Sequence, residues 1–206
     1  MIGQMGSFEY PSADIDEPLD CYIHGYVSSR IMNLARASEK GLPVCIAVTH
    51  LDGYVMTLSP FSHSYNYRSV VLHGYAKPVT DEDEKMYAMK LITNSVVPQR
   101  WENTRSPPDG GEMASTTILR VKIVDGSGKI RDGGASEEKR DIENAEVREK
   151  VWSGVLPVWQ TFGEPVPSPH NRVEVPQHIS AFIKETNERN ERYATDANAA
   201  AAAKEG

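Results

Sequence analysis

The sequence predicts a mainly β (α+β) fold, an antiparallel barrel with flanking helices. Three observations support this prediction. Apolar, β-prone runs recur along the chain with turn residues between them, few segments show helical spacing, and most predicted strands are not joined by a long helix. A doubly wound parallel sheet needs a helix in each of those connections, so the pattern favours antiparallel strands.

The first half of the chain is predicted to hold strands and two helices. A β-prone run stops at Gly25, after which Ser28 and Ser29 can cap a helix. Asp52-Gly53, between two apolar runs, is the strongest hairpin signal in the chain. Thr80 with Asp83 resembles the capping box of the second helix. The predicted elements are strand 21–24, helix 30–40, hairpin 44–59, strand 68–79 and helix 80–97.

The second half is predicted to hold two more strands and a terminal helix. Residues 116–126 alternate as a half-buried strand does, and 127–141 are polar and glycine-rich, which indicates a surface loop. Residues 151–169 read as a last strand followed by a Pro-rich strap, and 176–190 as an amphipathic helix.

Length and composition favour one domain with extensions. A chain of 206 residues with 39% hydrophobic content can bury a single core. We expect 1–18 to be an irregular segment, 19–186 to be the domain, and 187–206, which is charged and then alanine-rich, to be a disordered tail.

The net charge of −7 argues against partners chosen by bulk electrostatics, so no nucleic acid and no membrane is expected. Cys21 and Cys45 lie inside apolar runs without metal-ligand spacing, and we interpret them as small core residues in a reducing compartment. No secretory leader or membrane-spanning run is recognisable, so the expected location is cytoplasmic.

Ser28, Ser29 and Arg30 form the first candidate site. They stand at a predicted helix start, where free backbone N–H groups and the helix dipole attract anions, and where a guanidinium can grip a phosphate. The alternative is that Ser29 only caps the helix and Arg30 is solvated.

A second candidate is the segment from His63 to Ser69, in which Arg68 opens a strand after a loop rich in hydrogen-bonding groups. The alternative is an ordinary loop whose tyrosines pack on the barrel rim. Lys129 and Arg131 in a glycine-rich loop, and Trp152 at a strand start, are by themselves typical of solvated and core residues.

His24 and His73 each precede a glycine, where the backbone could approach a flat ligand closely. A strand histidine that is merely a core or edge residue is the alternative. The histidines show no metal-ligand spacing, so no metal is expected. Nucleophile-elbow, dinucleotide-fingerprint and Walker motifs are absent from the sequence.

Six blocks taken together resemble a known family. They are YIHGYVSSR, PVCIAVTHLDGYV, HSYNYRSVVLHGYAKPVTDEDEK, PQRWENTR, SGKIRDGG and VWSGVLPV. In this order they are similar to the flavin-nucleotide-binding branch of the pyridoxamine 5'-phosphate oxidase-like proteins, which includes the nitroimidazole-resistance proteins. The resemblance covers residues 19–183 and implies a six-stranded split β-barrel that forms a homodimer and binds FMN in grooves at the subunit interface.

The resemblance also implies roles for single residues. Ser28, Ser29 and Arg30 would face the FMN phosphate, and His24 would lie beside the isoalloxazine. The remaining cofactor contacts that it implies are Arg68, Ser69, Lys129, Arg131 and Trp152. His24 and His63 are the expected catalytic residues: His24, or alternatively Ser69, would donate to the polar edge of the ring, and His63, or alternatively Tyr65, would touch the substrate.

Relatives carry a helix and a first strand pair before the block that contains His24, whereas only about twenty residues precede that block here. The barrel could therefore lack its usual amino-terminal helix and first strand. The expected function is that of an FMN-dependent oxidoreductase acting on a small organic substrate by hydride or electron transfer. The alternative is a non-catalytic flavin-binding or dimeric scaffold protein.

Overall fold

The computed structural model describes residues 1–13, 17 and 19–199. The chain divides into two compact units. Unit 1 comprises Met1–Ile46 and Val71–Ser127, and unit 2 comprises Ala47–Val70 and the chain from Gly128 onward. Each unit is described by itself.

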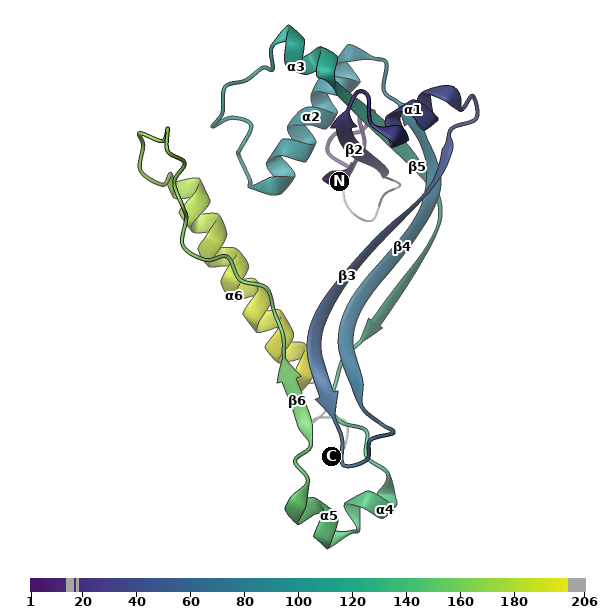
Figure 1. Cartoon of the computed structure of the whole chain (residues 1–206), viewed down its shortest axis with the longest axis vertical. Coiled ribbons are helices and arrows are strands. Elements are labelled where there is room, and N and C mark those ends of the chain that lie inside the picture. The colour runs from purple at the N-terminus through teal and green to yellow at the C-terminus, as the bar shows by residue number, and fades with distance from the viewer. Residues whose placement is uncertain (14–16, 18, 200–206) are drawn as a thin grey trace. The chain divides into compact units, whose positions relative to one another are not determined.

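Six strands form one sheet in the order β1-β2-β5-β4-β3-β6, and the pairs β1/β2, β2/β5 and β3/β6 are antiparallel. The predicted antiparallel α+β fold with flanking helices is thereby confirmed. The sheet is open, with β1 and β6 as its edges (Figure 1). The strands are β1 (Gly3–Gly6), β2 (Asp20–Tyr26), β3 (Leu42–Met56), β4 (Ser64–Pro78), β5 (Thr116–Arg131) and β6 (Gly154–Pro157).

Helices flank these strands. Asp81, rather than the expected Thr80, caps α2 by accepting a hydrogen bond from the Glu84 amide at 2.8 Å. The helices are α1 (Arg30–Ala37), α2 (Glu82–Val96), α3 (Gly110–Ser115), α4 (Lys139–Ile142), α5 (Ala145–Lys150) and α6 (Gln177–Ala199).

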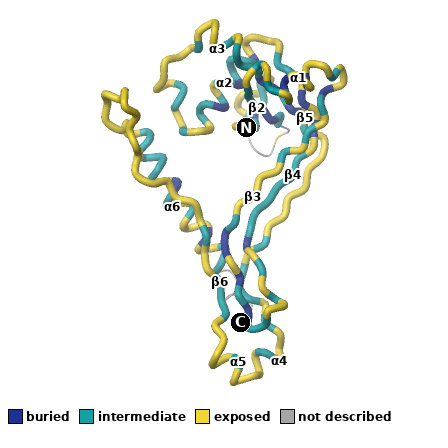
Figure 2. The backbone as a smooth tube through the Cα atoms, in the orientation of Figure 1, coloured by how far each residue is buried: buried dark blue, intermediate teal, exposed yellow. Residues whose placement is uncertain are grey.

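Unit 1 has two apolar clusters, which the alternation of side chains along β2 and β5 separates. Cys21 and Leu119 pack with Met32 and other residues of α1, whereas Tyr22 and Ile118 pack with Ala88 and Ile92 of α2. The buried segments of Figure 2 include these stretches of β2, β5 and the two helices. Each helix therefore covers one face of the same strands.

The amino-terminal segment, which we expected to be irregular, contains β1. Its four residues pair with β2, with Gly3 opposite Ile23 and Gly6 opposite Asp20. A short strand thus stands beside β2, although the sequence of this segment has none of the strong β-prone runs seen elsewhere.

The predicted hairpin at Asp52-Gly53 is wrong, because β3 runs without interruption from Leu42 to Met56. Asp52 is 3% exposed and is bound to Arg68, and a Cβ at Gly53 would lie 2.6 Å from Asn198 Oδ1. Asp52 and Gly53 therefore make packing contacts with distant residues and do not form a turn. The chain reverses after Met56, in the polar segment before β4.

Two further expectations change in unit 2. The predicted surface loop from residue 127 begins with strand, since β5 continues to Arg131. The tail expected to be disordered is helical as far as Ala199, while residues 200–206 lie outside the described residues. Asn198 holds this helix end by donating to the Asp52 carbonyl at 3.0 Å. The predicted domain boundaries at 18/19 and 186/187 stay predictions.

The two cysteines lie in different environments. Cys21 is buried in the α1-side cluster, as expected, and burial raises the pKa of its thiol. Cys45 is exposed, contrary to expectation, because the alternation along β3 directs Val44 and Ile46, not Cys45, to the core.

We expect a thiol reagent at neutral pH to modify one cysteine per chain rapidly in the folded protein, because accessible thiols react as thiolates and Cys21 is neither exposed nor readily ionised. Mass spectrometry after timed alkylation should place the fast label on Cys45. Cys45→Ser should abolish fast labelling until denaturant is added. Rapid labelling of folded Cys45→Ser would contradict the buried position of Cys21.

Candidate functional site

The start of α1 is the predicted phosphate site in unit 1. Ser29 is the N-cap residue, yet its side chain makes no capping hydrogen bond, and its Oγ is buried without a partner among the described residues. Ser28 and Arg30 are exposed, and the first turn contains no acidic residue. The helix therefore begins with an uncommitted hydroxyl, free amides and a cation, as an anion site requires.

The start of α2 gives the contrast within the same unit. Asp81 caps it, and Glu82, Asp83 and Glu84 fill its first turn. These carboxylates already satisfy the amides and the positive end of the helix dipole. Of these two helix starts, only that of α1 is prepared for an external anion.

His24 lies at the end of β2, next to this helix start. A Cβ at Gly25 would meet Met32 Cε at 2.7 Å and Ser29 Oγ at 3.7 Å, so the strand end abuts α1. The imidazole itself lies on the opposite face of β2, in an apolar cavity beneath α2. Its Nδ1 is buried without a hydrogen-bond partner, an arrangement that costs about 1–3 kcal/mol.

Arg68 of unit 2 is held by an ion pair and by an aromatic ring. Its Nε and Nη2 donate to the two carboxylate oxygens of Asp52 at 2.9 and 2.8 Å, and its guanidinium lies 3.6 Å from the centre of the Tyr193 ring. The hydrogen bonds to Asp52 raise the pKa of Arg68 above its ordinary value. Nη1 alone makes no hydrogen bond to any residue that the structure describes.

Ser69 and Lys129 lie beside Arg68. The Ser69 hydroxyl donates to the Lys129 carbonyl at 3.4 Å, and the Lys129 ammonium lies 5.9 Å from the Tyr67 ring centre. Arg68 and Ser69 line an open hollow of about 600 Å³, together with Val48, His50, Val70, Gly128 and Ile130. The structure thus brings Arg68, Ser69 and the backbone of Lys129 together on the sheet of unit 2.

Arg131, His63 and Trp152 lie elsewhere in unit 2. Arg131 donates to the buried Asn66 side chain. His63 Nδ1 lies 3.3 Å from the Thr57 amide nitrogen and 2.9 Å from the Thr57 hydroxyl oxygen, and His63 is exposed. Trp152 is 61% exposed and packs on Gly154. Arg131 is linked to the Arg68–Asp52 pair through Asn66 and Asn198, whereas no hydrogen bond between described residues joins His63 or Trp152 to that pair.

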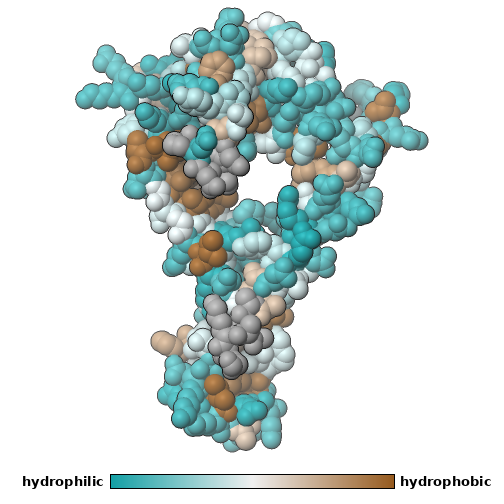
Figure 3. All heavy atoms as spheres, turned by 180° about the vertical axis from the view of Figure 1, so that it is seen from behind, coloured by the Kyte–Doolittle hydropathy of each residue, from teal (hydrophilic) through white to brown (hydrophobic). Residues whose placement is uncertain are grey.

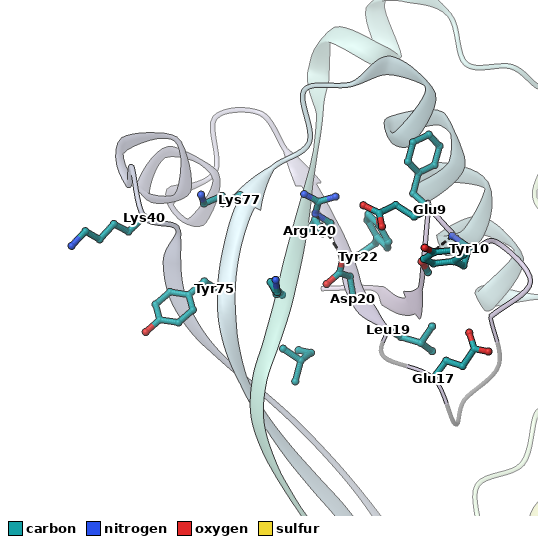
Figure 4. Close-up of a pocket in the computed structure, with 14 residues that line it drawn as sticks. Glu9, Tyr10, Glu17, Leu19, Asp20, Tyr22, Lys40, Tyr75, Lys77 and Arg120 are labelled. Carbon is teal, nitrogen blue, oxygen red and sulfur yellow. Dashed lines mark hydrogen bonds and ion pairs between the residues drawn. The ribbon is translucent and has the colours of Figure 1, made fainter.

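A polar network in unit 1 has no counterpart in the sequence prediction. Glu84, 7% exposed, accepts from the Tyr22 hydroxyl at 2.9 Å and from Arg120 at 2.9 Å, and Arg120 also lies 3.8 Å from Asp20. Burial, and then the bond to Glu84, raise the pKa of Tyr22, and burial raises the pKa of Asp20. Figure 4 shows Asp20, Tyr22 and Arg120 side by side on β2 and β5.

This network lines a pocket of about 870 Å³ in unit 1. Lys77 and Tyr75 of β4 also line it, and Glu9 and Tyr10 lie at its other end (Figure 4). Because the charges of Glu84 and Arg120 already pair with each other, the network stabilises the fold rather than offering free groups. No local sequence signal predicts it, since Tyr22 and Glu84 are 62 positions apart.

Two classes of site are not found in the described residues. No group of three or more His, Cys, Asp or Glu side chains there could hold a metal ion. Among the helices of residues 1–199, none combines the length and apolar character needed to cross a bilayer.

The open antiparallel sheet, and the start of α1 with an unpartnered Ser29 hydroxyl and no acidic residue in its first turn, define an α+β protein with a helix start suited to an anion. A family profile described as pyridoxamine 5'-phosphate oxidase matches residues 15–130, more than half of the chain. The chain therefore belongs to the pyridoxamine 5'-phosphate oxidase-like family, a family of flavin-binding proteins, and the predicted family membership is confirmed.

Two solved structures are similar over most of the chain. The FAD and heme binding protein from Mycobacterium smegmatis has 26% identity and a TM-score of 0.70, covering 80% of this chain and 77% of that chain. The flavocytochrome Anf3 from Azotobacter vinelandii has 26% identity and a TM-score of 0.68, covering 87% and 83%. No curated protein sequence matches the chain.

Proposed function

We propose that this protein binds FMN and acts as an FMN-dependent oxidoreductase on a small organic substrate. Membership of a flavin-binding family supports the cofactor class, as do two similar structures that are named for bound FAD or as a flavocytochrome. The proposal depends most on one observation, the start of α1, where Ser29 Oγ is buried with no partner among the described residues and the first turn of the helix contains no acidic residue.

An FMN phosphate carries close to two negative charges, so a protein of net charge −7 must bind it through local groups. In our proposal the Ser29 hydroxyl, the Arg30 guanidinium and the α1 amides hold the phosphate. Arg68, Ser69, Lys129, Arg131 and Trp152 belong to unit 2 and are proposed as further cofactor contacts, and Nη1 is the Arg68 nitrogen without a hydrogen-bond partner among the described residues. Asp52 and Tyr193 fix the orientation of Arg68.

The bound flavin would supply the hydride or electron exchange. The chain's own residues orient the reactants and move protons. His24, whose buried Nδ1 has no partner among the described residues, and His63, which is exposed, are proposed to face substrate or the polar ring edge.

We further propose a homodimer in which a second copy completes the cofactor site. Support comes from exposed apolar side chains, part of which appear as separate brown patches on the face in Figure 3. Those on the long strands include Val48, Tyr54, Tyr65, Val124 and Ile130. Light scattering on the purified protein tests this expectation.

The purified protein should be yellow, or should take up added FMN, and Arg30→Ala should weaken FMN binding at least about tenfold through the loss of a charge-assisted pair. Fluorescence quenching of FMN measures the affinity. Lys40→Ala is the matched control, because Lys40 is also an exposed cation of unit 1 but lies outside the start of α1. Equal affinities of Arg30→Ala and wild type would refute the phosphate assignment.

The identity of the cofactor and its redox activity need separate readouts. Chromatography of the cofactor released by denaturation distinguishes FMN from FAD, and release of FAD would retain the flavin class but correct the nucleotide. Bleaching by a nicotinamide donor, with return of colour in air, supports an oxidoreductase. Colour that only dithionite bleaches supports the non-catalytic flavin carrier, and a colourless protein that takes up no flavin overturns the proposal.

A further inference from the structure

Unit 1 contains a second hollow, separate from the start of α1, beneath α2. Its volume is about 320 Å³. Strand β2, strand β5, α2 and the loop after α2 provide its walls, which include His24, Met89, Ile92, Val96, Arg100 and Ile118. The lining is mainly apolar, with three threonines, one imidazole and one guanidinium as its polar groups.

The charged group in the lining of this cavity is positive. Arg100 is half-buried and forms no ion pair with any residue in the described ranges. None of the described residues that line the cavity is a carboxylate, although acidic residues outnumber basic ones in the chain. A half-buried guanidinium in an apolar setting is best satisfied by an anion, and the described part of the chain supplies none here.

His24 adds a second unsatisfied group in the same cavity. Its Nδ1 is sealed from solvent and has no hydrogen-bond partner within residues 1–13, 17 and 19–199. Buried polar atoms are nearly always paired in native proteins, and an exception indicates a missing partner. A ligand in this cavity that carries a donor or acceptor would supply it.

The backbone that carries Arg100 is built into a fixed and strained turn. Gln99 is the only non-glycine residue with positive φ in the described chain, at 61°. The Arg100 amide donates to the Val97 carbonyl at 3.1 Å, and the Trp101 amide donates to Asn94 Oδ1 at 2.7 Å. Strained backbone of this kind persists where its surroundings fix it, and it clusters at ligand sites.

The volume limits the size of the ligand. An apolar cavity of about 150 Å³ accepts benzene, so one of about 320 Å³ has room for one or two aromatic rings. We propose that the cavity between α2, β2 and β5 binds a small apolar carboxylate of this size, with the carboxylate toward Arg100 and His24 and the apolar body beside Ile92 and Ile118. The claim that such a carboxylate is the substrate rests on the proposed function. The claim that the cavity binds it does not.

The probe pair is 2-naphthoate and its neutral analogue 2-naphthalenemethanol, and calorimetry on the full chain measures both. We expect 2-naphthoate to bind more tightly than the alcohol. Arg100→Gln should weaken 2-naphthoate at least about tenfold, the loss of one charge-assisted pair, and leave the alcohol unchanged. Lys40→Gln, which removes an exposed cation of the same unit outside this cavity, should change neither.

A second variant tests the cavity itself. Val96 lies at the end of α2 and is 49% exposed, so Val96→Trp should occupy the cavity mouth without disturbing the core, and should abolish binding of both probes at unchanged melting temperature. Failure of 2-naphthoate to bind, or equal binding by wild type and Arg100→Gln, would overturn the inference. The absorbance of bound flavin is recorded on every sample before and after FMN is added, so binding of 2-naphthoate by a protein that neither contains nor takes up flavin would refute the oxidoreductase while supporting this site.

Discussion

Replacing Arg68 by Ala should lower the free energy of unfolding by about 3 kcal/mol, at the lower end of the range for breaking a buried ion pair. The substitution leaves the Asp52 carboxylate, 5% exposed, without its bidentate partner. We place the effect at the lower end because the Arg68 side chain is 36% exposed, and solvent screens that half of the pair. Loss of the guanidinium from the Tyr193 ring adds to the effect.

Urea denaturation followed by circular dichroism measures this loss. The double variant Arg68→Ala with Asp52→Asn should recover part of the stability, because it removes the unpaired charge rather than only its partner. A change below about 0.5 kcal/mol for Arg68→Ala, the size of an ordinary surface substitution, would show that the pair does not stabilise unit 2.

This result also decides how a flavin titration of Arg68 variants is interpreted. Arg68→Ala confounds a lost phosphate contact with a weakened fold, whereas Arg68→Lys keeps a cation near Asp52 but loses the two-pronged geometry. Arg30 has no such structural role, since it is exposed and forms no ion pair with a described residue. Arg30 is therefore the sharper probe of phosphate binding.

Local patterns were sufficient to predict several elements. The serines before Arg30 predict a helix start there, and Ser29 is the N-cap of α1. The alternation of Ile118, Leu119 and Val121 predicts a half-buried strand, and β5 places Ile118 against α2 and the other two against α1. Such elements depend on neighbours in the sequence, so periodicity is enough to find them.

Other features depend on partners far along the chain. Asp52-Gly53 has the composition of a hairpin turn, but Arg68, 16 positions on, and Asn198, 146 positions on, hold it inside a strand. No local pattern contains those partners. The strand character of Lys129 and Arg131 has the same origin, because sheet pairing overrides a polar, glycine-containing sequence.

The candidate sites divide in the same way. Ser29 and Arg30 are adjacent in sequence, so the start of α1 could be predicted. The cavity under α2 could not, because His24 and Arg100 belong to segments 76 positions apart and the block that contains Arg100 reads only as a loop. A short polar turn before a tryptophan gives no signal of its own.

Gly74→Ala should be among the most destabilising single substitutions in the chain, by about 3 kcal/mol or more, since severe overpacking exceeds the usual cost of an added methyl group. A Cβ at Gly74 would lie 2.4 Å from the Lys122 carbonyl oxygen and 2.9 Å from Val121 Cγ1. The first of these atoms is backbone of the neighbouring strand β5, which cannot move without disturbing the sheet.

Gly128→Ala is the matched control. Gly128 also lies in a long strand, and a Cβ there would meet no atom within 4 Å, so the substitution should be neutral or slightly stabilising through the unfolded chain. Thermal denaturation of both variants measures the difference. Equal melting temperatures would show that β4 and β5 do not approach as closely at Gly74 as the structure has it.

Gly25 and Gly74 each stand in a His-Gly-Tyr string, at residues 24–26 and 73–75, and the same measurement applied to Gly25→Ala assigns a cause to each glycine. A Cβ at Gly25 would clash with the end of the flexible Met32 side chain of α1, which can move away. A Cβ at Gly74 would clash with the backbone of β5, which cannot. Gly25→Ala should therefore cost less than Gly74→Ala. If packing within unit 1 requires both glycines, no flat ligand is needed to explain either of them. The two histidines still differ, because His24 lines the cavity under α2 and His73 does not.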